Sequence, residues 1–127
     1  MEYDITKQML EDHKQIDLLI DEFTETPTRN TLQKLKWNLE RHFLVEEKAI
    51  FAFSPDAQTV HTLKTQHQAV LDEITLLSAS QTNPTKLQTM LKKHSRFEDE
   101  SFYPKLDQHL TKTQKKEIID KITLILV

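Results

Sequence analysis

The chain has 127 residues, a length that fits one domain with its own hydrophobic core. It contains 17 Lys and Arg residues and 20 Asp and Glu residues, which give a formal net charge of −3. Proteins that bind nucleic acids through phosphate contacts usually have a surplus of basic residues, so we expect no nucleic-acid partner. The absence of Cys excludes disulfides, thiolate-bound zinc and iron–sulfur clusters, and the absence of Gly excludes glycine-rich phosphate-binding loops.

The beginning of the chain, residues 1–10, is polar and acidic, unlike a signal peptide. No apolar run approaches the roughly 18 residues that a membrane-spanning helix needs. We therefore expect a cytoplasmic protein without a membrane partner.

Apolar residues recur at steps of three and four along the chain, which predicts helices and no sheet. Ser54-Pro55 and Asn83-Pro84 each combine a capping side chain with a proline suited to a first helical turn, so we expect the third and fourth helices to begin there. We expect the fourth helix to stop near Pro104. The apolar stripes span residues 5–23, 32–53, 60–77 and 87–101.

The last part of the chain predicts a short fifth helix. Thr111 and Gln114 fit a capping box at its start. Its apolar side chains cover more than one face, so the segment is either buried in its own molecule or forms a subunit contact, and we expect a homodimer through it. These side chains are Ile118, Ile119, Ile122, Leu124, Ile125, Leu126 and Val127.

Four long helices with short connections imply antiparallel neighbours. The sequence therefore predicts an all-α fold, an up-down-up-down four-helix bundle with a short C-terminal fifth helix. We expect Trp37, Phe43 and Phe97 to pack between helices, and His61 and His109 to lie on the surface.

Each long stripe contains a histidine where Leu or Ile is expected. Glu46 and Glu98 each follow one of these histidines by four residues and so share its helix face. Residues 42–51 and 94–103 are near copies of one pattern, with His at the start, acidic residues at +4 and +5, and an aromatic residue at +9. The four histidines are His13, His42, His67 and His94.

The histidines lie at similar separations from the expected helix connections, so in an antiparallel bundle they meet in one layer. A lone buried histidine is more often a hydrogen-bonded core residue, but four histidines and two glutamates in one apolar layer need a compensating cation. Nitrogen and oxygen ligands without sulfur suit zinc, iron, manganese or copper, and six ligands exceed a mononuclear zinc site. Two glutamates that face each other are suited to bridge two metal ions. With an additional oxo or hydroxo bridge between two octahedral ions, about two coordination positions stay open.

The order His … His-x3-Glu … His … His-x3-Glu, with its continuation to Phe102-Tyr103-Pro104, resembles the haemerythrin-like family, the HHE cation-binding domains. The resemblance covers residues 5–110 and implies a single haemerythrin-like domain over residues 1–127. It also implies two non-haem iron ions, oxo- or hydroxo-bridged, with the two glutamates as bridges. The implied ligands are His13, His42, Glu46, His67, His94 and Glu98.

The sequence departs from the oxygen-carrying haemerythrins at two positions. Those proteins have His-x3-His on the third helix, whereas the residue four before His67 is Leu63. They place the carboxylate of the fourth helix five residues after its histidine, a position that Asp99 occupies here. Asp99 is therefore an alternative ligand to Glu98. If Glu98 is the ligand, we expect Asp99, like Glu47, to lie beside the ligands. The chain looks more like the broader prokaryotic and regulatory HHE set, with one more open metal position. The ferritin-like Glu-x2-His order does not occur at these sites.

Two functions are expected from this reading. The first is binding of O2 or a related small ligand, or sensing of iron or oxygen. The alternative is a di-iron oxidase, a peroxidase or an NO-handling enzyme, because open coordination positions permit activation of bound peroxide. A metal-free helical interaction module is the third reading.

Overall fold

A computed structural model describes residues 4–79 and 83–126. Within these ranges the chain is helical and forms no strand, so the all-α prediction is confirmed. None of the described helices combines the length and the apolar character needed to cross a membrane.

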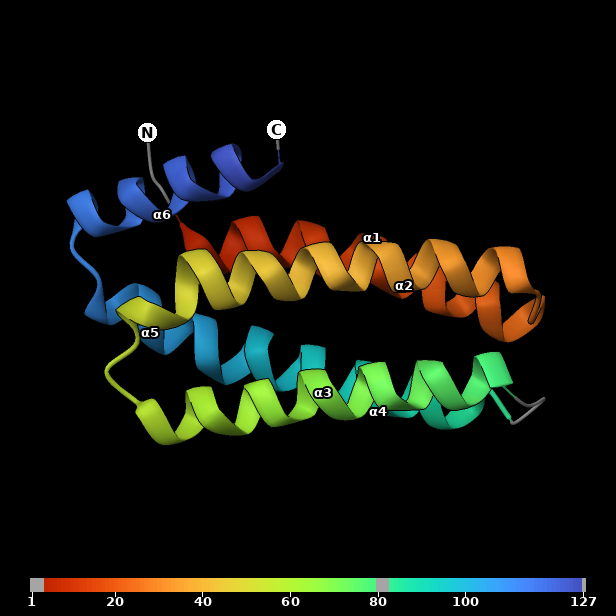
Figure 1. Ribbon diagram of the computed structural model, residues 1–127. Coiled ribbons are helices and arrows are strands. Elements are labelled where there is room, and N and C mark those ends of the chain that lie inside the picture. Colours follow the sequence, from red (N-terminus) through yellow and green to blue (C-terminus); the bar gives the residue numbers. More distant parts are fainter. Residues whose placement is uncertain (1–3, 80–82, 127) are drawn as a thin grey trace.

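Four long helices lie side by side, with α1 and α2 in one layer and α3 and α4 in the other (Figure 1). Contacts link α1 to α2, α2 to α3, α3 to α4, and α4 back to α1, while α6 packs against α2. Two π-helical turns, η1 and η3, continue α2 and α4, and a 3-10 turn, η2, follows η1. The elements are α1 (Ile5–Glu25), α2 (Arg29–Val45), η1 (Glu46–Ile50), η2 (Phe51–Phe53), α3 (Ala57–Ala79), α4 (Thr85–Phe97), η3 (Glu98–Phe102), α5 (Tyr103–His109) and α6 (Lys112–Leu126).

Local capping explains the starts of α3 and α6, but α3 and α4 begin at Ala57 and Thr85, after the prolines that were expected in their first turns. Thr111 and Gln114 form the predicted capping box of α6, at 2.9 and 3.1 Å. Pro84 is the N-cap of α4, and Asn83 before it accepts the Thr85 N–H at 2.9 Å. The cap of α3 is Asp56 rather than Ser54, because the Asp56 carboxylate accepts the Thr59 N–H at 3.0 Å.

The expected end of the fourth helix near Pro104 is wrong. The chain passes from α4 through η3 into α5 and stays helical to His109. Pro104 lies in the first turn of α5, a place where the missing N–H is tolerated.

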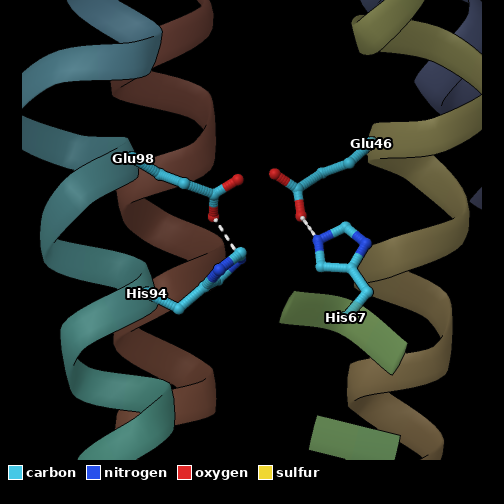
Figure 2. Close-up of side chains that lie close together, drawn as sticks. All are labelled: Glu46, His67, His94 and Glu98. Atoms are coloured by element: carbon cyan, nitrogen blue, oxygen red, sulfur yellow. Dashed lines mark ion pairs between the residues drawn. The ribbon is translucent and has the colours of Figure 1, made fainter. Parts of the chain in front are cut away.

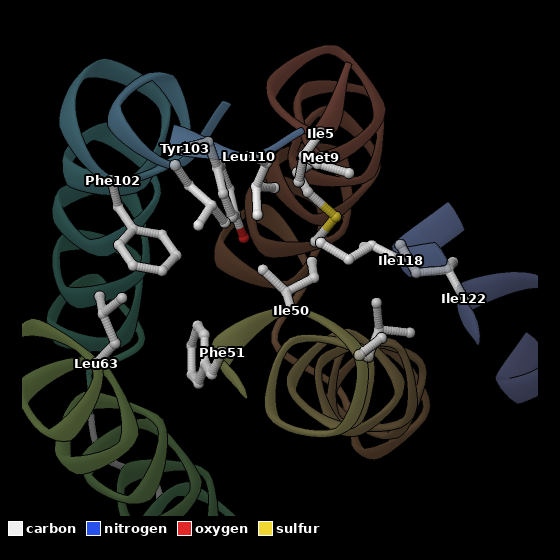
Figure 3. Packing of buried hydrophobic residues seen from close by; sticks show 13 residues of the cluster. Ile5, Met9, Ile50, Phe51, Leu63, Phe102, Tyr103, Leu110, Ile118 and Ile122 are labelled. Atoms are coloured by element: carbon white, nitrogen blue, oxygen red, sulfur yellow. The ribbon is translucent and has the colours of Figure 1, made fainter. Parts of the chain in front are cut away.

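Two apolar clusters fill the interior, one on each side of the histidine layer. Along α1, Ile5 and Met9 belong to the first cluster and Ile16 and Ile20 to the second, and His13 lies between them. Figure 3 shows the first cluster, to which α6 contributes Ile118 and Ile122.

The apolar face of α6 is therefore largely used within its own molecule. Ile118 and Ile122 are buried, and Ile119 and Ile125 pack partly buried against the same cluster. Leu124 is 77% exposed. Val127 and the side chain of Leu126 lie outside the described part of the chain.

Candidate metal centre

The structure brings all six predicted site residues together in the interior. None of them is more than 5% exposed. Glu46 and Glu98 are the first residues of the two π-helical turns, η1 and η3, and such turns are frequent at functional sites. The histidines come one from each long helix: His13 from α1, His42 from α2, His67 from α3 and His94 from α4.

The ring Nε2 atoms and one oxygen of each glutamate face a common centre. Glu46 Oε1 lies 3.0 Å from His42 Nε2 and 3.1 Å from His67 Nε2. Glu98 Oε1 lies 3.2 Å from His13 Nε2 and 3.1 Å from His94 Nε2. The His67 and His94 pairs approach from opposite sides of the centre (Figure 2).

These inward atoms are not satisfied by the protein. Glu46 Oε1, Glu98 Oε1, His67 Nε2 and His94 Nε2 are buried and have no partner in hydrogen-bond geometry among the described residues. His13 Nε2 and His42 Nε2 face each other at 3.1 Å. Buried polar atoms without partners are costly, and a cation at the centre would satisfy nitrogen lone pairs and carboxylates together.

The outer nitrogen of every histidine has an acceptor. Asp99 contacts His13 Nδ1 at 2.7 Å, and Asp12 contacts His42 Nδ1. Glu47 contacts His67 Nδ1 at 3.2 Å, and Gln66 contacts His94 Nδ1 at 2.6 Å. An Nδ1–H that donates outward leaves the Nε2 lone pair directed inward, which is the arrangement of metal-binding histidines.

This geometry also distinguishes the roles of neighbouring carboxylates. Asp99 contacts the outer nitrogen of His13, whereas Glu98 contacts the inner one. Glu98 and not Asp99 therefore lies at the centre, and Asp99 and Glu47 lie beside it. Sequence reasoning missed Asp12 and Gln66, although each directly precedes a site histidine.

The electrostatics of the metal-free site follow from burial and from the carboxylates. Burial would lower the pKa of His13, but Asp99 and Glu98 raise it to about 9. Burial also opposes the charge of His42, yet Glu46 and Asp12 raise its pKa well above the ordinary value. Burial would raise the pKa of Glu98, but its contacts with Glu46 and the histidines lower it well below the ordinary value. In the metal-free site the neighbouring carboxylates thus favour the protonated forms of His13 and His42.

Aromatic rings cover the α3 side of the centre. Phe43 stacks on His67 with ring centroids 3.8 Å apart, and Phe51 stacks on the same ring at 5.7 Å. Phe43 is buried as expected, but Trp37 and Phe97 are 61% and 40% exposed, so their expected packing between helices is wrong. The Trp37 ring is instead covered by the Arg41 guanidinium, 4.9 Å from its centroid. His61 and His109 are exposed, as expected.

The donor set fits a metal ion. Two groups of buried side chains each place their ligand atoms within 4.8 Å of one another, and both groups include Glu98. The first group is Glu46, His67, His94 and Glu98, and the second is His13, His42 and Glu98.

Comparison with known proteins returned no match to a protein-family model, to a curated protein or to a solved structure.

Proposed function

We propose that this chain is a non-haem di-iron protein of the haemerythrin-like type, folded as an up-down-up-down four-helix bundle with a short C-terminal fifth helix. In this proposal it works in the cytoplasm and binds O2 or a related small ligand, or senses iron or oxygen. The observation that carries the proposal is the pair of buried His and Glu groups that share Glu98.

Each half of the proposed site contributes two imidazoles. His13 and His42 would hold one ion, and His67 and His94 the other, with Glu46 and Glu98 between them. Four imidazoles and two carboxylates suit iron and leave coordination positions open on both ions. Two ferrous ions held by these residues would supply the electrons for the reduction of a diatomic ligand such as O2.

The protein around the site has two roles in this proposal. The outer partners Asp12, Glu47, Gln66 and Asp99 hold the imidazole rings in place. Phe43 and Phe51 keep water away from the α3 side. Among residues 4–79 and 83–126, the titratable side chains at the centre are the proposed ligands and their hydrogen-bond partners.

The test is the response of ferrous protein to small ligands. Protein loaded with ferrous iron without oxygen should change its visible spectrum when O2 is added and regain the first spectrum when O2 is removed. Zinc-loaded protein is the control, because zinc has no redox chemistry. An irreversible change with steady consumption of peroxide or NO would instead establish the enzymatic alternative, and no response to any of these ligands would contradict the proposal.

A further inference from the structure

The hydroxyl of Tyr103 lies beside the Oε2 atoms of both glutamates. Tyr103 is the first residue of α5 and is fully buried. Its hydroxyl donates to Glu46 Oε2 and lies 3.3 Å from Glu98 Oε2. The second oxygens of both carboxylates thus converge on one phenol.

The first oxygens of the same carboxylates lie between histidines of the two halves. Glu46 Oε1 lies between His42 of α2 and His67 of α3, at 3.0 and 3.1 Å. Glu98 Oε1 has the same relation to His13 of α1 and His94 of α4, at 3.2 and 3.1 Å. Each Oε1 atom is therefore placed to contact both ions of a pair held by the two halves.

We propose that Tyr103 restricts Glu46 to bridging the two metal ions through one oxygen atom, Oε1, while Oε2 stays on the phenol. This inference rests on the proposed function, because it needs two ions. Tyr103 is then a positioning residue that acts through Glu46. Without the hydroxyl, both oxygens of the Glu46 carboxylate are free, and Glu46 can place one oxygen on each ion.

Of the two sequence repeats, residues 42–51 and 94–103, the second carries this hydroxyl. Tyr103 occupies the +9 position of residues 94–103, and the matching residue of 42–51 is Phe51. Phe51 has no hydroxyl, and its ring packs against His67 and Phe102. The phenol at the +9 position of the second repeat therefore donates its one proton to the glutamate of the first repeat, Glu46.

The two bridging modes differ in measurable ways. A bridge through one oxygen holds two ions closer than a three-atom O–C–O bridge does. It also separates the two carboxylate stretching frequencies more widely, because the two C–O bonds become unequal. The iron–iron separation and the carboxylate frequencies can both be measured without turnover.

The experiment compares wild type with Tyr103→Phe, each loaded with ferrous iron without oxygen. Iron per chain is counted, X-ray absorption gives the iron–iron separation, and infrared difference spectra of protein labelled with ¹³C-glutamate give the carboxylate frequencies. In Tyr103→Phe we expect the iron count to stay at two per chain, the iron–iron separation to lengthen and the frequency separation to narrow. Thr24→Val is the matched control, because it also removes one hydroxyl, which donates to the carbonyl oxygen of Ile20 and has no contact with the site residues. It should keep the wild-type separation.

Wild-type protein that binds two irons with equal C–O bonds in the bridging glutamates would overturn the inference and leave the proposed function standing. The same holds if Tyr103→Phe binds two irons with an unchanged separation. Fewer than two irons in wild type would overturn the proposed function itself. If Tyr103→Phe does not fold, the wild-type frequencies alone decide.

Discussion

Each histidine of the site has its outer hydrogen-bond partner on a neighbouring helix or on the π-helical turn that continues that helix. Asp12 on α1 binds the histidine of α2, and Glu47, which follows α2, binds that of α3. Gln66 on α3 binds the histidine of α4, and Asp99, which follows α4, binds that of α1. The orientation of every imidazole therefore depends on the position of a neighbouring helix.

The pH dependence of the metal-free protein tests this electrostatic picture. Burial would lower the pKa of His13, but Asp99 and Glu98 raise it from 6.5 to about 9, so the folded chain binds this proton more tightly than the unfolded chain. The resulting stability is fully present below pH 6.5 and is lost as the pH rises to about 9. We expect the free energy of unfolding to fall on the order of 3 kcal/mol across this interval. Urea unfolding in the presence of a chelator measures it.

The His13→Gln variant is the control for this measurement, since it lacks the titrating ring. Its unfolding free energy should change less with pH than that of wild type. A wild-type free energy of unfolding that stays flat from pH 6.5 to 9 would show that His13 is not held protonated.

Bridging and terminal ligands should differ when they are removed. Glu46 contacts histidines of both halves, whereas His67 belongs to one half only. Glu46→Ala should therefore lose more than half of the bound iron, and His67→Ala should retain at least one ion in part. Iron is counted after reconstitution and desalting. Equal losses in the two variants would contradict a bridging role for Glu46.

The candidate site residues could be predicted because histidines interrupt apolar stripes and glutamates follow two of them by one turn. Their outer partners could not be predicted as readily. Asp12 and Gln66 bind histidines on other helices, and which side chains meet depends on how each helix is rotated about its axis. A single sequence does not specify that rotation.

At the scale of elements, the π-helical turns change which side chains face inward. A period of 3.6 residues continues the fourth stripe from Glu98 to Ser101. In the structure Phe102 and Tyr103 are buried instead, at 5% and 0% exposure, while Ser101 is half-buried. The wider turn of η3 advances the inward face by about one residue, which brings the Tyr103 hydroxyl to the glutamates.

Asp107 joins the start of α1 to α5 and α6. Its carboxylate accepts the N–H groups of Ile5 and Thr6 at 3.0 and 2.7 Å, and Lys115 lies 3.4 Å away. Asp107→Ala leaves two N–H groups of α1 without this partner, so we expect a loss of about 1–3 kcal/mol in unfolding free energy. Urea unfolding measures the loss.

Asp120→Ala provides a matched control, because Asp120 and its partner Lys116 are both well exposed and form an ordinary i, i+4 pair. This variant should lose less than about 0.5 kcal/mol. If Asp107→Ala is no less stable than Asp120→Ala, the link between α1 and α5 does not stabilise the fold.

At the scale of the whole molecule, the sequence predicted helices and their approximate limits, because 3.6-residue periodicity and caps are local signals. It left open whether the last helix is buried in its own molecule or forms a subunit contact, and it did not specify that Ile118 and Ile122 of α6 pack into the first cluster. Which neighbouring face an apolar helix covers depends on the shape of the assembled core. The position of α6 is therefore a tertiary property.

The predicted homodimer through α6 now rests on a smaller surface. With Ile118 and Ile122 buried inside the molecule, Leu124 is the large apolar side chain that α6 leaves most exposed within its described part. Light scattering on wild type should give the mass of two chains, and Leu124→Asp should give the mass of one. A wild-type mass of one chain would discard the dimer.

The most direct test of a two-ion centre is the number of metal ions per chain. Protein reconstituted with ferrous iron, desalted and analysed for elements should contain about two irons per chain, because six buried ligands form two groups that share Glu98. A value near one, or zinc retained after iron loading, would contradict the di-iron centre.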